Sequence, residues 1–228
     1  MYYYGFGYDS GYLLLVIVST LLGVITQAYI NHTYNEWSAV PTSTGETGAE
    51  VARRMLDSEG ASEVGIASVG GRLTDFYDPR DNKLHLSSEN MHGGSVASVA
   101  VACHEAGHAV QRARGYVPMR VRTALVPVVN FASQAWMVVF FLGVFANAVG
   151  LVRIAIFLFA FSVLFQLVTL PVEFDASRRA VTYVRESGLD EEAVDGARSV
   201  LTAAALTYVA AALTSILQLL WLVGRSRD

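Results

Sequence analysis

The sequence contains a single cysteine, Cys103, among 228 residues. One cysteine cannot form a disulfide within the chain, and it excludes a zinc site built from several thiolates. Charged residues are also scarce, at 16% of the chain, whereas soluble domains carry about a quarter. The net charge of −4 leaves no basic surface for nucleic acid, and no nucleic-acid-binding motif is present. The scarcity of charge, together with 53% hydrophobic residues, predicts a membrane protein.

The first twelve residues contain no lysine or arginine, so the start of the sequence lacks the charged region of a secretory signal. The apolar run that follows is therefore expected to be a retained membrane span. Three further runs are long enough to cross the hydrocarbon core at about 1.5 Å per residue. The four expected spans are Tyr12–Ile30, Ala124–Ala146, Leu151–Leu170 and Val200–Val223.

These spans divide the chain into five expected parts. They are a tail and first span (1–30), a cytoplasmic domain (31–123), a membrane hairpin (124–170), a second cytoplasmic segment (171–199), and a fourth span with its tail (200–228). Two spans separate the domain from the segment, so both are expected on one side of the membrane. Thirteen lysines and arginines lie on that side and three on the other. This bias predicts that the domain and the segment face the cytoplasm.

A metal-binding motif lies inside the expected domain. The residues His104-Glu105-Ala106-Gly107-His108 fit the pattern H-E-x-x-H. On a helix, positions i and i+4 share one face, so both imidazoles can bind one metal ion. The carboxylate of Glu105 can then take a proton from a metal-bound water, which makes it the candidate general base.

The residues around the motif predict a small α+β domain. A helix is expected from Ser95 to Arg114, with Gly115 at its C-terminal end and Pro118 preventing its resumption. Upstream, the pattern predicts a short helix at Glu46–Leu56, a strand at Val64–Val69, and a β-hairpin formed by Leu73–Tyr77 and Lys83–Ser87. Downstream, a separate helix is expected from Val172 to Glu186, after Pro171.

A catalytic zinc ion commonly has three protein ligands, so His104 and His108 need a partner. No third histidine follows the motif, and His32, His85 and His92 all lie upstream. Glu173 is the better candidate, because it directly follows the third span on the same side of the membrane as the motif. Alternatively, Glu173 has no role in metal binding and is present because the helix dipole favours an acidic residue in the first turn of a helix.

Two stretches give the chain a family resemblance. The motif HEAGH, followed by LPVEFDASRRA after a pair of spans, resembles the YugP-type neutral zinc metallopeptidases of prokaryotic membranes. The stretches TGAEVARRMLD and LTDFYDPRDNKLHLS extend this resemblance over most of the chain. Gluzincins of the HtpX and CAAX-prenyl-protease type are more distantly similar. The resemblance implies that His104, His108 and Glu173 bind zinc and that Glu105 is the general base.

The sequence departs from the wider gluzincin pattern at one position. Ser177 stands four residues after Glu173, where those proteins have an aspartate that orients a ligand histidine. Either the hydroxyl of Ser177 or the carboxylate of Asp175 could take that role. Arg178, Arg179 and Tyr183 are candidates for stabilising an oxyanion, although the arginines would also suit a cytoplasmic lipid boundary.

The predicted fold is mainly α: a four-span helical membrane protein with a small zincin-like α+β metallopeptidase domain on the cytoplasmic face. The predicted function is zinc-dependent hydrolysis of peptide bonds in peptide or protein substrates, including membrane-bound ones. The ligand set would also accept Mn²⁺ or Co²⁺. One alternative is an intramembrane site-two-type protease, although the apolar run Ser95–Cys103 is too short to be a span. The other is a membrane adaptor with a structural metal.

Overall fold

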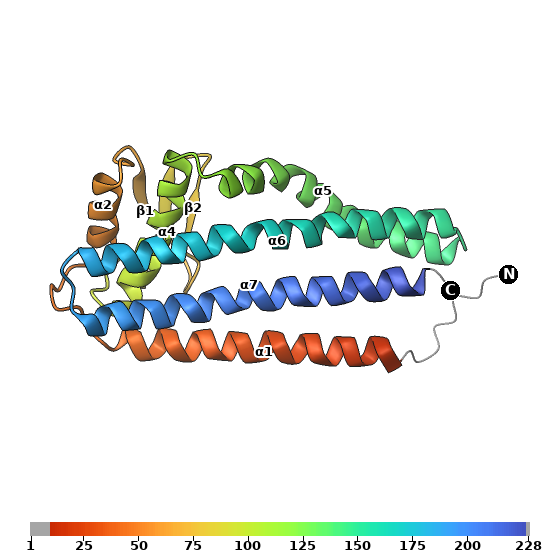
Figure 1. Cartoon of the computed structure of the whole chain (residues 1–228), viewed down its shortest axis with the longest axis horizontal. Coiled ribbons are helices and arrows are strands. Elements are labelled where there is room, and N and C mark those ends of the chain that lie inside the picture. The colour runs from red at the N-terminus through yellow and green to blue at the C-terminus, as the bar shows by residue number, and fades with distance from the viewer. Residues whose placement is uncertain (1–9, 227–228) are drawn as a thin grey trace. The chain divides into compact units, whose positions relative to one another are not determined.

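The computed structural model describes residues 10–226 and is mainly helical (Figure 1). Seven helices and three short strands follow one another along the chain. In order they are α1 (Ser10–Ser38), α2 (Gly48–Ser58), β1 (Gly65–Val69), β2 (Phe76–Asp78), β3 (Lys83–Ser87), α3 (Ser88–His92), α4 (Val96–Ala113), α5 (Val117–Phe145), α6 (Val149–Glu186) and α7 (Glu191–Arg225). They form two compact units. We call residues 10–26, 121–170 and 207–226 the span unit, and residues 27–120 and 171–206 the motif unit.

Four of the described helices, α1, α5, α6 and α7, are long and apolar enough to cross a membrane, which confirms the predicted number of candidate spans. Within the span unit, Val152, Ile156 and Phe159 of α6 form a buried cluster with Leu222 of α7. Large apolar side chains elsewhere in this unit are exposed, such as Phe145 with 83% of its surface accessible. Such exposure is costly in water and suits lipid contact. Residues 146–148 alone separate α5 from α6, as the predicted hairpin requires.

Two prolines do not end helices as the sequence predicted. Pro118 lies in the first turn of α5, where no backbone N–H is needed, so the next helix begins directly after Gly115. Pro171 lies inside α6, which runs unbroken from Val149 to Glu186 (Figure 1). Proline has no N–H, so the one hydrogen bond that this helix loses is the bond to the carbonyl of Leu167, four residues earlier. The helix continues through this missing bond.

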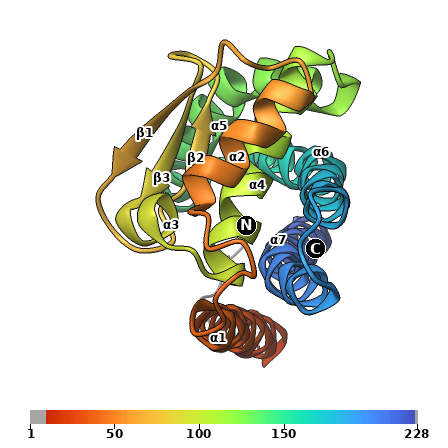
Figure 2. The same cartoon turned by 90° about the vertical axis from the view of Figure 1, so that its left-hand side faces the viewer.

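The three strands form one sheet in the order β1-β3-β2. Strands β2 and β3 pair antiparallel as the predicted hairpin, although β2 is shorter than expected, and β1 pairs parallel to β3. Leu84 and Leu86 of β3 are fully buried, whereas His85 between them is only half-buried. This alternation gives the sheet one core face, which packs on α4 (Figure 2).

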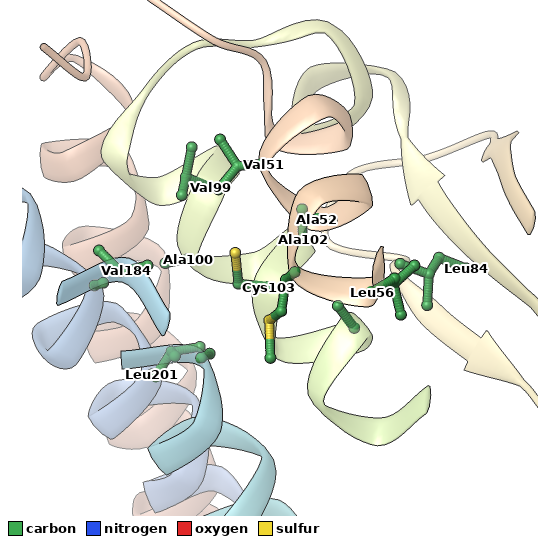
Figure 3. Close-up of a cluster of buried hydrophobic side chains, with 14 of the residues drawn as sticks. Val51, Ala52, Leu56, Leu84, Val99, Ala100, Ala102, Cys103, Val184 and Leu201 are labelled. Atoms are coloured by element: carbon green, nitrogen blue, oxygen red, sulfur yellow. The ribbon is translucent and has the colours of Figure 1, made fainter. Parts of the chain in front are cut away.

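Helix α4 lies at the centre of the motif unit. Ser95 caps its first turn by accepting a hydrogen bond from the Ser98 N–H at 3.1 Å, and Gly115 follows its last turn with φ +65°. Val99, Ala100 and Cys103 are buried among side chains of α2, α6 and α7 (Figure 3). Because α4 is buried nearly all round, the polar residues of the motif are buried with it.

Candidate metal centre

The two motif histidines lie one turn apart on α4 and face the same way. Their rings meet edge to face with centroids 4.8 Å apart, and at most 9% of either residue is exposed. A helix from Ser95 onwards is enough to produce this arrangement, because residues i and i+4 lie above one another. The pair therefore offers two imidazole nitrogens to one point.

Glu173 of α6 completes the group. Its Oε2 lies 3.3 Å from His104 Nε2 and 3.5 Å from His108 Nε2, although 69 residues separate it from His104 in the sequence. Two ligand atoms bound to one tetrahedral zinc ion at 2.0–2.1 Å lie roughly 3.4 Å apart. The spacing and the donor set of two imidazoles and one carboxylate therefore fit a zinc ion. Within residues 10–226 this is the one cluster of at least three such side chains with metal-ligand spacing.

The carboxylate of Glu173 lies in the motif unit, beyond the expected third span, and is nearly inaccessible to solvent. Burial by itself would raise its pKa, but hydrogen bonds with His104 and His108 outweigh this effect and hold the pKa well below its usual range. Glu173 is therefore an anion at neutral pH, as a carboxylate ligand must be.

Close approach of α6 to α4 at Gly107 brings Glu173 to the histidines. A Cβ atom built on Gly107 would lie 2.9 Å from the backbone oxygen of Ala176 and 3.2 Å from its Cα. Any larger residue between the two histidines would therefore displace backbone rather than a flexible side chain. The glycine within the motif sets the distance between the helix that carries the histidines and the helix that carries the acid.

Replacing Gly107 by Ala should lower the thermal stability and weaken zinc binding. The added methyl group cannot fit without moving α6, and overpacking of this kind costs about 1–3 kcal/mol, which outweighs the roughly 1 kcal/mol by which alanine favours a helix. Melting temperature and zinc affinity, measured by chelator competition, would show both effects. Gly23→Ala in α1 is the matched control, since nothing lies within 4 Å of a Cβ built there. Equal zinc affinity in the two variants would contradict this account.

Glu105 lies on α4 beside the three candidate ligands and is 8% exposed. Its Oε2 accepts a hydrogen bond of 3.0 Å from the backbone N–H of Tyr77 in β2, one of the two edge strands of the sheet. Burial raises the pKa of Glu105 to about 7; the nearby carboxylates of Glu173 and Asp75 also raise it, while His104 and the Tyr77 N–H act in the opposite direction. A carboxylate with a pKa near neutrality is suited to take up and release protons.

A hydrogen-bonded chain orients His108. The amide nitrogen of Gln111 donates to the Val172 carbonyl and to Asp175 Oδ2, at 2.7 and 2.9 Å. Because both of these partners are acceptors, the amide oxygen of Gln111 is the atom that faces His108 Nδ1, at 3.1 Å. Nδ1 must then carry the proton, which leaves the Nε2 lone pair directed towards Glu173. The tautomer that binds metal is thereby selected.

A separate contact orients His104. The hydroxyl of Ser177 lies 3.2 Å from His104 Nδ1. The sequence left Ser177 and Asp175 as alternatives for orienting a ligand histidine, and in the structure each of them acts on a different histidine. Ser177 contacts His104 directly, and Asp175 acts on His108 through Gln111.

The three residues proposed from the sequence to stabilise an oxyanion are engaged in other contacts. Arg178 and Arg179 both bind Asp175, the latter at 2.6 Å, and these contacts help to lower the pKa of that buried carboxyl against the effect of burial. Tyr183 lies ten residues after Glu173, about 15 Å along α6, where it packs on the core and contacts Ser58. The structure thus brings Ser177 and, through Gln111, Asp175 to the histidines, whereas Arg178 and Arg179 pair with Asp175 and Tyr183 lies outside the site.

The upstream histidines do not join the cluster. His85 Nε2 lies 3.0 Å from Asp81 Oδ2, and its ring stacks on Phe76 with centroids 4.7 Å apart. Two contacts that sequence reasoning missed are those of Gln111 and of the Tyr77 N–H. Gln111 lies three residues after His108, on the same face of the helix, and this spacing was the available signal. The donor of Tyr77 is its backbone N–H, so no pattern of side chains in the sequence could have indicated this contact.

Replacing Gln111 by Leu should reduce zinc affinity about 10–100-fold, as loss of a partner of a ligand histidine usually does. Leucine has a similar size but cannot accept the proton of His108 Nδ1, so the histidine loses its preferred tautomer. Chelator competition on the purified full chain measures the affinity. Unchanged affinity in the leucine variant would show that the bond does not orient His108.

Comparison with known proteins agrees with this site. A family model described as "Putative neutral zinc metallopeptidase" matches residues 12–227, which include every residue of the site described above. A relative named "Putative membrane protease YugP", from Bacillus subtilis (strain 168), is 42% identical over 212 residues, which cover 92% of this chain and 93% of the relative. No solved structure gives a significant match. Since the match spans nearly the whole chain, the protein belongs to this family of zinc metallopeptidases.

Proposed function

We propose that the protein is an integral-membrane zinc endopeptidase in which His104, His108 and Glu173 bind the metal ion and Glu105 is the general base. The observation that carries this proposal is the position of the Glu173 carboxylate, at 3.3 and 3.5 Å from the two histidines. A structural metal site would have no use for Glu105, a fourth ionisable side chain that lies beside the ligands with a pKa near 7. This argues for an enzyme over a membrane adaptor.

Each residue has a defined task in peptide hydrolysis. When bound, a zinc ion supplies a Lewis acid that polarises the substrate carbonyl and acidifies the attacking water. Glu105 accepts the proton of that water and passes it to the leaving amine, while the Tyr77 N–H holds its carboxylate in place. Ser177 and Gln111 keep the two histidines in the orientation that presents Nε2.

We further propose that the motif unit faces the cytoplasm. The expected domain 31–123 and segment 171–199 contain nine and four of the sixteen lysines and arginines, and three lie elsewhere. Positively charged residues accumulate on the cytoplasmic side of membrane proteins. Helix α4 is not among the four candidate spans of residues 10–226, so an intramembrane position of the motif is not favoured.

The test uses the full chain, purified in detergent. It should contain about one zinc ion per molecule, as three protein ligands and one open position require, and it should cleave casein or members of a peptide library. A strong chelator should remove both metal and activity, and stoichiometric zinc should restore both. Cleavage that persists at full rate in metal-free protein would refute the proposal. In right-side-out vesicles, externally added protease should leave residues 31–123 intact; their digestion would refute the cytoplasmic orientation alone.

A further inference from the structure

A groove of about 400 Å³ lies between α6 and α7 within the motif unit. Its apolar part is formed by Val181, Leu201 and Ala205, with the half-exposed ring of Phe174 beside them. Its polar part carries three guanidinium groups and two threonines: Arg178, Arg185, Arg198, Thr182 and Thr202. None of the described side chains that line it is acidic. An apolar surface rimmed by cations suits a ligand that is both apolar and anionic.

The groove is distinct from the space in which a peptide bond would be cleaved. Ser177 lines the groove and lies at 3.2 Å from Nδ1 of His104, whereas Nε2 of the same ring faces Glu173. The two nitrogens point in different directions from the ring, so the groove lies on the side of His104 that is turned away from the ligand atoms. A molecule bound in the groove would therefore not occupy the metal centre.

The groove also lies close to the membrane boundary along both helices. Arg178 is eight residues beyond Leu170, about 12 Å along α6, and Arg198 is nine residues before Thr207, where the span unit resumes, about 14 Å along α7. Arg185 lies farther out, fifteen residues beyond Leu170, or about 22 Å. Headgroups fill roughly 5–8 Å beyond the hydrocarbon core, and arginine side chains extend towards them. The guanidinium groups of Arg178 and Arg198 can therefore extend towards the lipid phosphates, and Arg185 lies at the outer end of the groove.

The arginines retain capacity for such a ligand. Arg198 lies 3.1 Å from Asp195, and both side chains of this ion pair are more than half exposed. An exposed ion pair of this kind contributes little to stability, so it does not hold Arg198 firmly. Arg185 forms no ion pair within the described part of the chain. We propose that the groove binds an anionic phospholipid of the leaflet on this side of the membrane, with the phosphate at the guanidinium groups and part of an acyl chain along the exposed ring of Phe174.

This proposal requires that the chain crosses a membrane, but it does not depend on peptidase activity. Native mass spectrometry of the full chain, titrated with phosphatidylglycerol or with zwitterionic phosphatidylcholine, measures lipid retention directly. The wild-type chain should retain phosphatidylglycerol preferentially. The double variant Arg185→Gln/Arg198→Gln should bind it about 5–25-fold less tightly, from roughly fivefold for each cation removed near an anionic lipid.

Two further variants keep the test specific. Arg80→Gln removes an equally charged and 88% exposed side chain outside the groove, and should retain phosphatidylglycerol like the wild type. Thr202→Trp keeps every charge but fills the groove, and should also weaken retention. Equal retention of the two lipids, or an equal loss in Arg80→Gln, would overturn the proposal. So would binding of a soluble aspartate-rich peptide that needs Arg185 and Arg198, without a preference for phosphatidylglycerol, because the occupant would then be a protein segment.

Discussion

Replacing Glu105 by Gln is expected to reduce peptide hydrolysis by about a hundredfold to ten-thousandfold, the range that a positioned general base contributes. Glutamine has nearly the same shape and can still accept the hydrogen bond from the Tyr77 N–H through its amide oxygen. It cannot take a proton from water. The loss should therefore appear in the chemical step while the fold remains intact.

Zinc content distinguishes this outcome from a general loss of the site. Glu105 is not one of the three side chains whose atoms converge, so Glu105→Gln should retain about as much zinc as the wild type. Glu63→Gln is a suitable control, because Glu63 is an exposed glutamate of the same unit. Full activity of Glu105→Gln would exclude the proposed mechanism, and a low zinc content would instead assign Glu105 a role in holding the metal.

Replacing Glu173 by Gln is expected to lower zinc affinity more than a hundredfold, beyond the 10–100-fold that changes around a ligand usually cause. The substitution keeps the size of the side chain between the two histidines but removes its negative charge. A neutral amide is a poor zinc ligand compared with a carboxylate. Activity should fall in parallel, and excess zinc should restore part of it.

A second glutamate on the same helix provides the control. Glu186 ends α6 and is exposed, so Glu186→Gln should leave both zinc binding and activity unchanged. If Glu173→Gln kept the wild-type affinity, His104 and His108 would have to hold the metal with some other third ligand, and the proposed site would be wrong. The two variants therefore separate a lost ligand from a general change in the charge of α6.

Most of α4 could be predicted from the sequence because its determinants are local. The Ser95 cap, the apolar positions and Gly115 lie within 21 consecutive residues, and the 3.6-residue period alone places His104 above His108. The four apolar runs were likewise recognisable, because length and composition decide whether a helix can span lipid. Pro118 and Pro171 were misjudged. Whether a proline ends a helix depends on its position in the turn and on the surrounding packing.

The sequence by itself was enough to identify the two histidines and the acid after the third span as suitable metal ligands, and the glutamate between the histidines as a suitable general base. Only the tertiary structure decided how they meet. The register of α6 against α4 depends on the contact of Gly107 with Ala176, and this register places Ser177 at one histidine and Asp175, through Gln111, at the other. Positions within one helix follow from its period, whereas the register of two helices 69 residues apart follows from side-chain packing that no local pattern encodes.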